Sequence, residues 1–217
     1  MELRRGSQIA YRPAMSNALL NVLAVVGSLN KTSVTRVVVN QAASNLAAHG
    51  CRVDVLDLLA EPLELYNPDS AYSSANYLGL RARVQQADVY VLGTPDYHGS
   101  ISSPLKNFLD HFWHEFTGKL FATIVASHEK GLTVTDQLRT VARQCYAWSL
   151  PYGVSFMEGE DVRGGQVTSE TLKRRLDMFV RDVRTYGRLL ADQRRADLSG
   201  KEAGFMARLR ERESADT

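Results

Sequence analysis

The chain has 217 residues, of which 44% are hydrophobic and 23% are charged, and its formal net charge is +2 at pH 7. This length and composition suit one soluble globular domain with a single core. So small a net charge gives no support to nucleic-acid or anionic-membrane binding, and no apolar stretch reaches the roughly 20 residues that a membrane span needs.

Residues 1–20 show no periodicity and contain Gly6 and Pro13, so we expect an N-terminal arm. The basic residues near the start are not followed by an apolar core, so we expect no secretory signal. We therefore expect Cys51 and Cys145 to be free, buried thiols and the protein to be cytoplasmic.

From residue 21 onward, apolar strands alternate with amphipathic helices. A continuous apolar run at 22–26 predicts a central strand, and the helix expected at 34–49 has Gly50 as its C′ residue. The later elements are expected as strands at 52–58, 89–92, 120–126 and 152–157 and as helices at 76–87, 104–116, 133–148 and 169–193. Residues 59–75 have no convincing period and are expected to cover the ligand edge or a subunit interface.

This alternation predicts an α/β fold, with helices on both faces of a five-stranded, doubly wound parallel sheet. The order 2-1-3-4-5 would place a crevice between the first and third strands. The loops at 27–35 and 94–100 both lie at that crevice. We expect one domain over 21–193, followed by a charged C-terminal tail over 194–217.

The loop after the first strand has the composition of an anion site. It begins with Gly27, which lets the chain turn, and the helix dipole adds about half a positive charge at its end. Its hydroxyl groups belong to Ser28, Thr32, Ser33 and Thr35. The loop contains neither GxxxxGK[ST] nor GxGxxG. Two interpretations remain open here: a phosphate-monoester site, or a simple polar turn with Ser33 as the helix N-cap.

The loop after the third strand suits a planar ligand, and we expect the strand itself to break at Gly93. Tyr97 can lie against a ring, while Gly99 lets the backbone approach closely and direct N–H groups at ring heteroatoms. The alternative is an ordinary loop in which the polar ends of Tyr97 and His98 are satisfied. We expect Ser103 to be the N-cap of the next helix and Pro104 its first residue.

Two segments, GSLNKTSVTR at 27–36 and TPDYHGSISSPLKNFLDHF at 94–112, resemble the NADPH-dependent FMN reductase family, which is flavodoxin-like. The resemblance covers about 21–190 and implies a tightly bound FMN. It assigns the FMN phosphate to Ser28, Asn30, Ser33 and Thr35. It assigns the isoalloxazine ring to Pro95, Asp96, Tyr97, His98 and Gly99. The loop that would close over the other side of the ring contains Ser127, His128 and Gly131.

The chain departs from the pattern of that family at two places. Asn30 stands where the family usually has arginine, so a bidentate donor is lost and either Lys31 or the backbone must supply the positive charge. Ser102 and Ser103 replace the usual Ser-Gly pair, which favours helix capping over backbone freedom.

The resemblance implies that hydride passes from NADPH or NADH to FMN and then to an acceptor such as a flavin, quinone, azo compound or metal ion. Tyr97 is expected to position the ring, and no catalytic side chain is required. The main alternative is a flavodoxin-type electron carrier that does not oxidise a nicotinamide, and a weaker one is a cofactor-free scaffold. Flavodoxins typically have a TxTGxT loop and are strongly acidic, whereas this chain has GSLNKTS and a slight positive charge.

Two further features concern the helix at 104–116. His111 and His114 could form a metal pair, but no further ligand is placed by the sequence, so a solvated helix face is favoured and no metal is expected. An excess of apolar residues on this helix predicts a homodimer or homotetramer, and these residues are Phe108, Phe112, Trp113 and Phe116.

Overall fold

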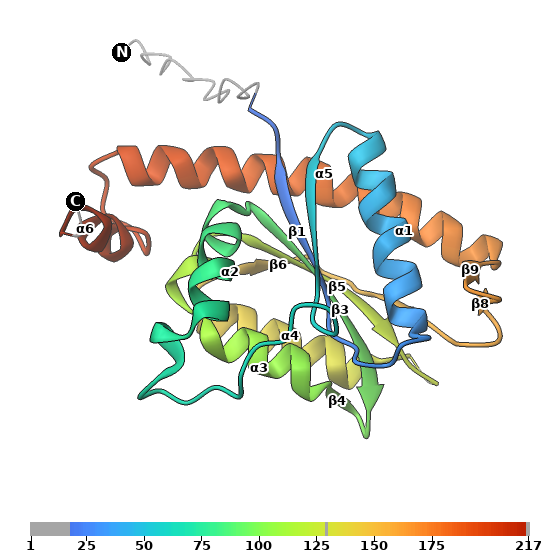
Figure 1. Ribbon diagram of the computed structural model, residues 1–217. Coiled ribbons are helices and arrows are strands. Elements are labelled where there is room, and N and C mark those ends of the chain that lie inside the picture. The colour runs from blue at the N-terminus through green and yellow to red at the C-terminus, as the bar shows by residue number, and fades with distance from the viewer. Residues whose placement is uncertain (1–17, 129, 216–217) are drawn as a thin grey trace, which may run out of the picture.

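The computed structural model describes residues 18–128 and 130–215, which form a central sheet between two layers of helices (Figure 1). The strands follow the order β2-β1-β3-β5-β6, and β7 pairs with the far end of β5. Their bounds are Arg52–Asp57 for β2, Asn21–Val26 for β1, Val89–Tyr97 for β3, Leu120–Ala126 for β5, Trp148–Ser149 for β6 and Val154–Phe156 for β7. All these pairings are parallel. The predicted flavodoxin-like order is therefore confirmed, with β6 and β7 together in the fifth position.

Helices cover both faces of the sheet, as predicted. One face is covered by α1 (Val34–Ala48) and α5 (Glu170–Ser199). The other face is covered by α2 (Ala75–Gln86), α3 (Ser103–His111) and α4 (Leu132–Gln144) (Figure 1). Short 3₁₀ helices, η1 at Ala71–Ser73 and η2 at His114–Phe116, precede α2 and follow α3.

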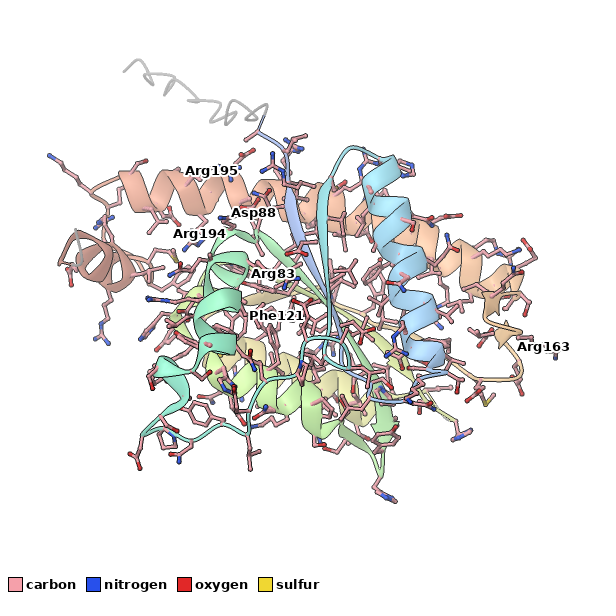
Figure 2. The ribbon with its side chains drawn as sticks, viewed as in Figure 1. Arg83, Asp88, Phe121, Arg163, Arg194 and Arg195 are labelled. Atoms are coloured by element: carbon pink, nitrogen blue, oxygen red, sulfur yellow. The ribbon has the colours of Figure 1, made fainter. Side chains whose placement is uncertain are left out.

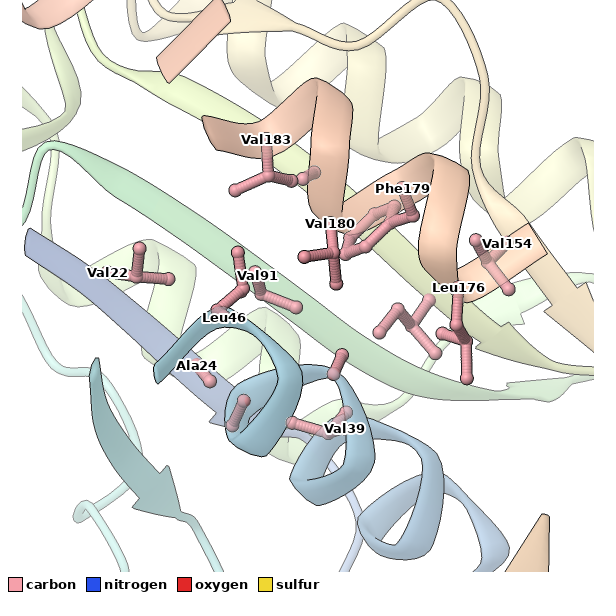
Figure 3. Close-up of a cluster of buried hydrophobic side chains, with 14 of the residues drawn as sticks. Val22, Ala24, Val39, Leu46, Val91, Val154, Leu176, Phe179, Val180 and Val183 are labelled. Atoms are coloured by element: carbon pink, nitrogen blue, oxygen red, sulfur yellow. The ribbon is translucent and has the colours of Figure 1, made fainter. Parts of the chain in front are cut away.

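Strand β1 shows how the sequence builds the two cores. Val22 and Ala24 face α1 and α5, whereas Leu23 and Val25 face α2 and α3, because successive side chains of a strand point to opposite faces. Both faces of a central parallel strand are covered, so all these positions are apolar. Figure 3 shows Val22 and Ala24 in the core between the sheet and the α1/α5 layer, together with Leu46 of α1.

The fifth strand differs from the continuous strand expected at 152–157. It consists of two short pieces, β6 and β7, and the chain leaves the ladder between them. Pro151 lies in this break and has no N–H to donate to a neighbouring strand. Gly153 follows, and a Cβ there would lie 2.5 Å from Thr123 Oγ1, so the chain passes close to β5 at this point.

The third strand is longer than predicted, and the expectation that it breaks at Gly93 is wrong. It continues to Tyr97 and turns back into β4 (Ser100–Ile101), which forms the projecting tip at the lower edge in Figure 1. The two turn residues, His98 and Gly99, have φ values of 57° and 73°. Positive φ at both positions is the signature of a type I′ hairpin turn, which matches the twist of the strands it joins.

Helix α3 begins and ends earlier than predicted. Its N-cap is Ser102, whose Oγ accepts a hydrogen bond from the N–H of Leu105, so Ser103 is the first helical residue and Pro104 the second. The helix ends at His111, and Phe112 is already extended, with φ −131° and ψ 141°. The apolar pattern continues to residue 116 because Phe116 of η2 is buried in the same cluster as Phe108 of α3.

The shorter helix changes what its aromatic and histidine residues do. Phe108, Phe112 and Phe116 are buried in the core cluster beside Tyr90, so the excess of apolar residues is used inside the domain. Only Trp113 of the predicted interface set is exposed, by 53%.

His111 is 2% exposed, and its Nδ1 lies 2.8 Å from the carbonyl oxygen of Asn107. The expectation of a solvated histidine face is therefore wrong for His111. Among residues 18–128 and 130–215, no group of three or more potential ligands is arranged for a metal ion.

Two other helices end elsewhere than expected. Helix α4 stops at Gln144, because Tyr146 takes a positive φ of 55° and β6 begins at Trp148. Helix α5 continues past Gln193 to Ser199 and is joined to the start of β3 by an ion pair of 3.3 Å between Arg195 and Asp88 (Figure 2).

The remaining described elements are small. A hairpin of β8 (Val162–Arg163) and β9 (Gln166–Val167) occupies the Gly-rich loop, and a last helix, α6 (Ala207–Ala215), follows α5. Cys51 and Cys145 are free thiols. No helix within the described ranges has the length and apolar character required to cross a bilayer. Most of the expected arm, residues 1–17, lies outside the described residues.

Candidate functional site

The carboxyl ends of β1 and β3 meet at two glycines. The N–H of Gly27 donates to the carbonyl oxygen of Gly93 at 2.8 Å. A Cβ on Gly27 would lie 2.7 Å from that oxygen and 2.7 Å from Leu105 Cβ, so only glycine fits. Ser102 Oγ donates to the carbonyl oxygen of Gly27 at 2.5 Å and thereby joins the start of α3 to the first loop. The two loops named from the sequence are therefore held side by side.

A cavity of about 180 Å³ lies at this junction. Its walls come from the loop after β1, the end of β3 and the loop after β5. Ser33 and Tyr97 both line it, although they belong to different βα units. The other predicted site residues that line it are Ser28, Asn30, Thr35, Pro95, Asp96, Ser127 and His128.

A second cavity of about 720 Å³ adjoins the first. The two cavities share Asp96, Ser127 and His128. The remaining predicted site residues, which line only the second cavity, are His98, Gly99 and Gly131. The structure thus brings all the residues chosen from the sequence to one edge of the sheet.

The first loop is shaped by hydrogen bonds from its own side chains. Ser33 Oγ accepts from the N–H of Arg36 at 3.4 Å, so this serine is the N-cap of α1. Asn30 Oδ1 accepts from both the N–H and the hydroxyl of Thr32, at 3.0 and 3.1 Å. Asn30 therefore fixes a local turn and its carboxamide oxygen is already used.

Arg36 is a residue of this site that the sequence reasoning missed. Its guanidinium donates to the carbonyl oxygens of Asn30 at 2.7 Å, Ser28 at 3.2 Å and Lys31 at 3.3 Å. The carbonyl oxygens of Ser28, Asn30 and Lys31 are therefore hydrogen-bonded to a cationic side chain. The motif quoted from the sequence ended on Arg36, but its place in the helix gave no sign that the side chain reaches back under the loop.

Asp57 at the end of β2 completes this arrangement. Partial burial opposes ionisation of its carboxyl group, but the hydrogen bonds from Arg36, Leu59 and Ala60 outweigh burial and hold the pKa of Asp57 below its usual value. The carboxylate therefore stays ionised and fixes the arginine.

The other end of the site depends on Asp96. One carboxylate oxygen accepts from the N–H of Gly99 at 2.8 Å, and the other accepts from Ser127 Oγ at 2.9 Å. Asp96 thus joins the hairpin tip to the loop after β5. Both of its oxygens have protein partners, so the side chain acts as a brace between two walls of the cavities.

Gln137 of α4 is a second residue that the sequence reasoning missed. Its Oε1 accepts from Ser100 Oγ and from the N–H of Ile101, both at 3.1 Å, and its Nε2 donates to the carbonyl oxygen of Gly99 at 3.4 Å. The only sequence signal is a polar residue beside the buried Leu138, which by itself carries no function. The hairpin is thus clamped from the helix behind it.

Tyr97 projects from this clamped hairpin. Its side chain is 54% exposed, and among the described residues it has no hydrogen-bond partner for its hydroxyl group. An aromatic ring on a fixed backbone, free on one side, can stack on a flat molecule.

Comparison with known proteins agrees with this geometry. The sequence profile described as NADPH-dependent FMN reductase matches residues 20–161. An FMN-dependent NADPH-azoreductase of Staphylococcus aureus (strain USA300) is 32% identical over 152 residues, which cover 64% of this chain and 80% of that protein.

Two solved structures share the fold. The apo form of an NADH:FMN oxidoreductase has a TM-score of 0.64 at 17% identity and covers 78% of this chain and 89% of its own. The flavoenzyme NAD(P)H:(acceptor) oxidoreductase FerB from Paracoccus denitrificans has a TM-score of 0.60 at 21% identity and covers 81% of this chain and 98% of its own. At such identities these structures establish the fold alone.

Proposed function

The chain belongs to the NADPH-dependent FMN reductase family, and on that premise we propose how it holds FMN. It is an FMN-dependent oxidoreductase with NAD(P)H as the electron donor. The phosphate end of FMN lies on the loop after β1, and the isoalloxazine lies against the end of β3. The observation that carries this placement is that Ser33 and Tyr97 line one cavity.

The first loop fits a phosphate monoester. Its carbonyl oxygens at 28, 30 and 31 are bound to Arg36, so they are turned to a cation and away from an incoming anion. The start of α1 adds free N–H groups and the positive end of a helix dipole. Arg36 is paired with Asp57 and holds the loop in shape, so the backbone N–H groups at the start of α1 take the place of the family's usual arginine at Asn30.

The hairpin and the loop after β5 fit a flat ring. Asp96 accepts from the N–H of Gly99 and Gln137 from that of Ile101, so these two N–H groups fix the shape of the hairpin and are not directed at a ligand. Ser127 forms the opposite wall and is bound to the same carboxylate. Tyr97, Pro95 and the wall at Ser127 and His128 are the contacts that we assign to the ring.

When bound, FMN would supply the redox chemistry that links hydride loss by the nicotinamide to two-electron reduction of an acceptor. With a quinone, the donor loses a hydride, and the quinone gains two electrons and two protons, one of them from solvent. The protein's own part is to orient the ring and to shape the space above it.

The surface of the segment before α2 supports self-association. Asn107 fixes this segment, since its Oδ1 accepts from the N–H of Tyr66 at 2.8 Å. Leu65 is nevertheless 86% exposed, and Tyr72 of η1 and Leu78 of α2 are exposed as well. We propose a homodimer through this surface, which Leu65→Glu should convert to monomer in light-scattering measurements. The free Cys51 and Cys145 fit the cytoplasm as the proposed location.

The experiment that tests the FMN placement uses Tyr97→Ala. Purified wild-type protein should be yellow, and its visible flavin absorption should bleach with NADPH under anaerobic conditions. Tyr97→Ala should lower both FMN affinity and the rate of bleaching, whereas Tyr186→Ala, which removes an exposed tyrosine from α5, should do neither. A Tyr97→Ala protein with full FMN affinity and full rate would overturn the placement.

A further inference from the structure

The larger cavity has a distinct chemical character. Three side chains on its walls are cations or N–H donors, and these are His98, His128 and Lys130. They come from two different elements, the β3–β4 hairpin and the loop after β5. All of them are exposed to solvent, and none forms an ion pair with any residue in the described ranges.

Among the described residues that line this cavity, the one carboxylate is already hydrogen-bonded to the protein. Asp96 lines the cavity, but its oxygens accept from Gly99 and Ser127. Glu158 lines the smaller cavity and not the larger one. The described walls of the larger cavity therefore present one lysine and two imidazoles, and Glu129, between His128 and Lys130 in the sequence, lies outside the described residues.

Its location links this charge to the reaction. The larger cavity shares Asp96, Ser127 and His128 with the smaller one, where the FMN ring is placed. The larger cavity therefore adjoins the place where a molecule would exchange at the ring. Its volume of about 720 Å³ accommodates a molecule of drug size, since ligand pockets commonly measure about 300–1,000 Å³.

We propose that this cavity is an anion subsite for the electron acceptor, and this rests on the proposed function. The acceptors it favours are aromatic quinones or azo compounds that carry a sulfonate or carboxylate group. The flat part of the acceptor lies at the flavin ring, and its anionic group lies among His98, His128 and Lys130. Oxyanions accept hydrogen bonds from imidazole N–H and ammonium groups, which makes these contacts charge-assisted.

The kinetic test compares two acceptors that differ in charge. We would measure kcat/KM of the FMN-loaded enzyme for 1,4-naphthoquinone and for 1,4-naphthoquinone-2-sulfonate. In Lys130→Met, kcat/KM for the sulfonate should fall relative to that for the neutral quinone by roughly threefold to fivefold, as expected for a partly screened charge. His98→Asn should act in the same direction, and asparagine tolerates the positive φ at that position.

A binding test removes turnover from the comparison. Naphthalene-2-sulfonate and its neutral sulfonamide are not reduced, so calorimetric titration of the FMN-loaded protein reports affinity alone. The wild type should bind the sulfonate more tightly, and Lys130→Met should remove most of that difference. Lys201→Met, which removes an exposed lysine near α6, is the matched control and should preserve it.

Two results would overturn the inference. One is an unchanged preference for the sulfonate over its neutral partner in Lys130→Met and His98→Asn. The other is a loss confined to kcat/KM for NADPH, which in ping-pong kinetics reports the donor half-reaction and would assign the cations to the phosphates of the nucleotide. Protein that fails to retain FMN or to reduce the neutral quinone would instead overturn the proposed function, so the two failures are distinguishable.

Discussion

Arg36 and Asp57 form a two-point ion pair beneath the loop after β1, with Nε 2.5 Å and Nη2 3.2 Å from the two carboxylate oxygens. The same guanidinium binds three carbonyl oxygens of the loop. Because Asp57 ends β2 and Arg36 lies in the first turns of α1, the pair fixes the helix start relative to the sheet edge. The shape of the loop after β1 thus depends on a residue contributed by the neighbouring strand.

Arg36→Met should weaken FMN binding specifically through the phosphate. Without the guanidinium, the loop carbonyls are no longer held and the N–H groups lose their orientation. We expect the Kd for FMN to rise about tenfold or more, on the scale of losing a hydrogen bond to a charged group. The Kd for riboflavin, which has no phosphate, should change less than about twofold. Fluorescence titration of the apoprotein measures both.

Arg83→Met is the matched control for this prediction. Arg83 of α2 (Figure 2) also forms ion pairs with carboxylates, Asp54 of β2 at 2.7 Å and Glu61 at 2.6 Å, but among the described residues its polar contacts do not include the loop after β1. This variant should bind FMN and riboflavin as the wild type does. If Arg36→Met weakened the binding of FMN and riboflavin equally, Arg36 would support only the overall fold.

Acid should destabilise the protein in part through Asp57. Its pKa is lower in the folded state than in the unfolded chain, so its contribution is present above the unfolded pKa of about 3.9 and is lost as the pH falls through the folded value. The free energy of unfolding, measured with urea between pH 6 and about pH 3, should therefore decline less steeply in Asp57→Asn than in the wild type. Arg36→Met should flatten the decline in the same way, because Arg36 provides the main interaction that lowers this pKa. A decline as steep as that of the wild type in both variants would contradict the assignment.

Gly93 should tolerate no side chain. A Cβ at this position would overlap Val39 Cγ2 of α1 and would lie 3.3 Å from Thr35 Cγ2. Gly93→Ala should lower the free energy of unfolding by about 1–3 kcal/mol, as overpacking does. The double variant Val39→Ala/Gly93→Ala should recover part of that loss, because the shorter side chain makes room. Gly79→Ala in α2, where nothing lies within 4 Å, should be neutral or stabilising.

The sheet order and the grouping of the two loops were predictable because they follow from local signals. Apolar runs such as 22–26 mark buried parallel strands, and the flavodoxin-like order then brings the loops at 27–35 and 94–100 together. The break in the fifth strand was harder to predict from the sequence, because Pro151 and Gly153 interrupt strand pairing only where a partner strand is already in place. Pattern alone could not decide where the ladder resumes.

Residues that act through tertiary contacts were not predictable from the sequence. Arg36 and Gln137 lie on helices whose periodic pattern only says that they are polar. Their roles arise because one guanidinium reaches three carbonyls and one carboxamide reaches the hairpin. His111 illustrates the reverse case: a polar residue that pattern places on a solvated face is enclosed by Tyr66, Tyr77 and Phe112.

Cys145 should be nearly unreactive in the folded protein. It is 8% exposed, and burial, with a smaller effect from Asp110, raises its pKa to about 11 from 9.0. At pH 8 the reactive thiolate would then be about a hundredfold scarcer than in the unfolded chain. In a Cys51→Ala background, modification of Cys145 by a thiol reagent should be at least about a hundredfold slower without urea than with it. Because the folded pKa is raised, the stability that this thiol contributes is present below pH about 9 and is lost as the pH rises toward 11. Rapid modification of the folded variant at pH 8 would contradict both the burial of Cys145 and this pH dependence.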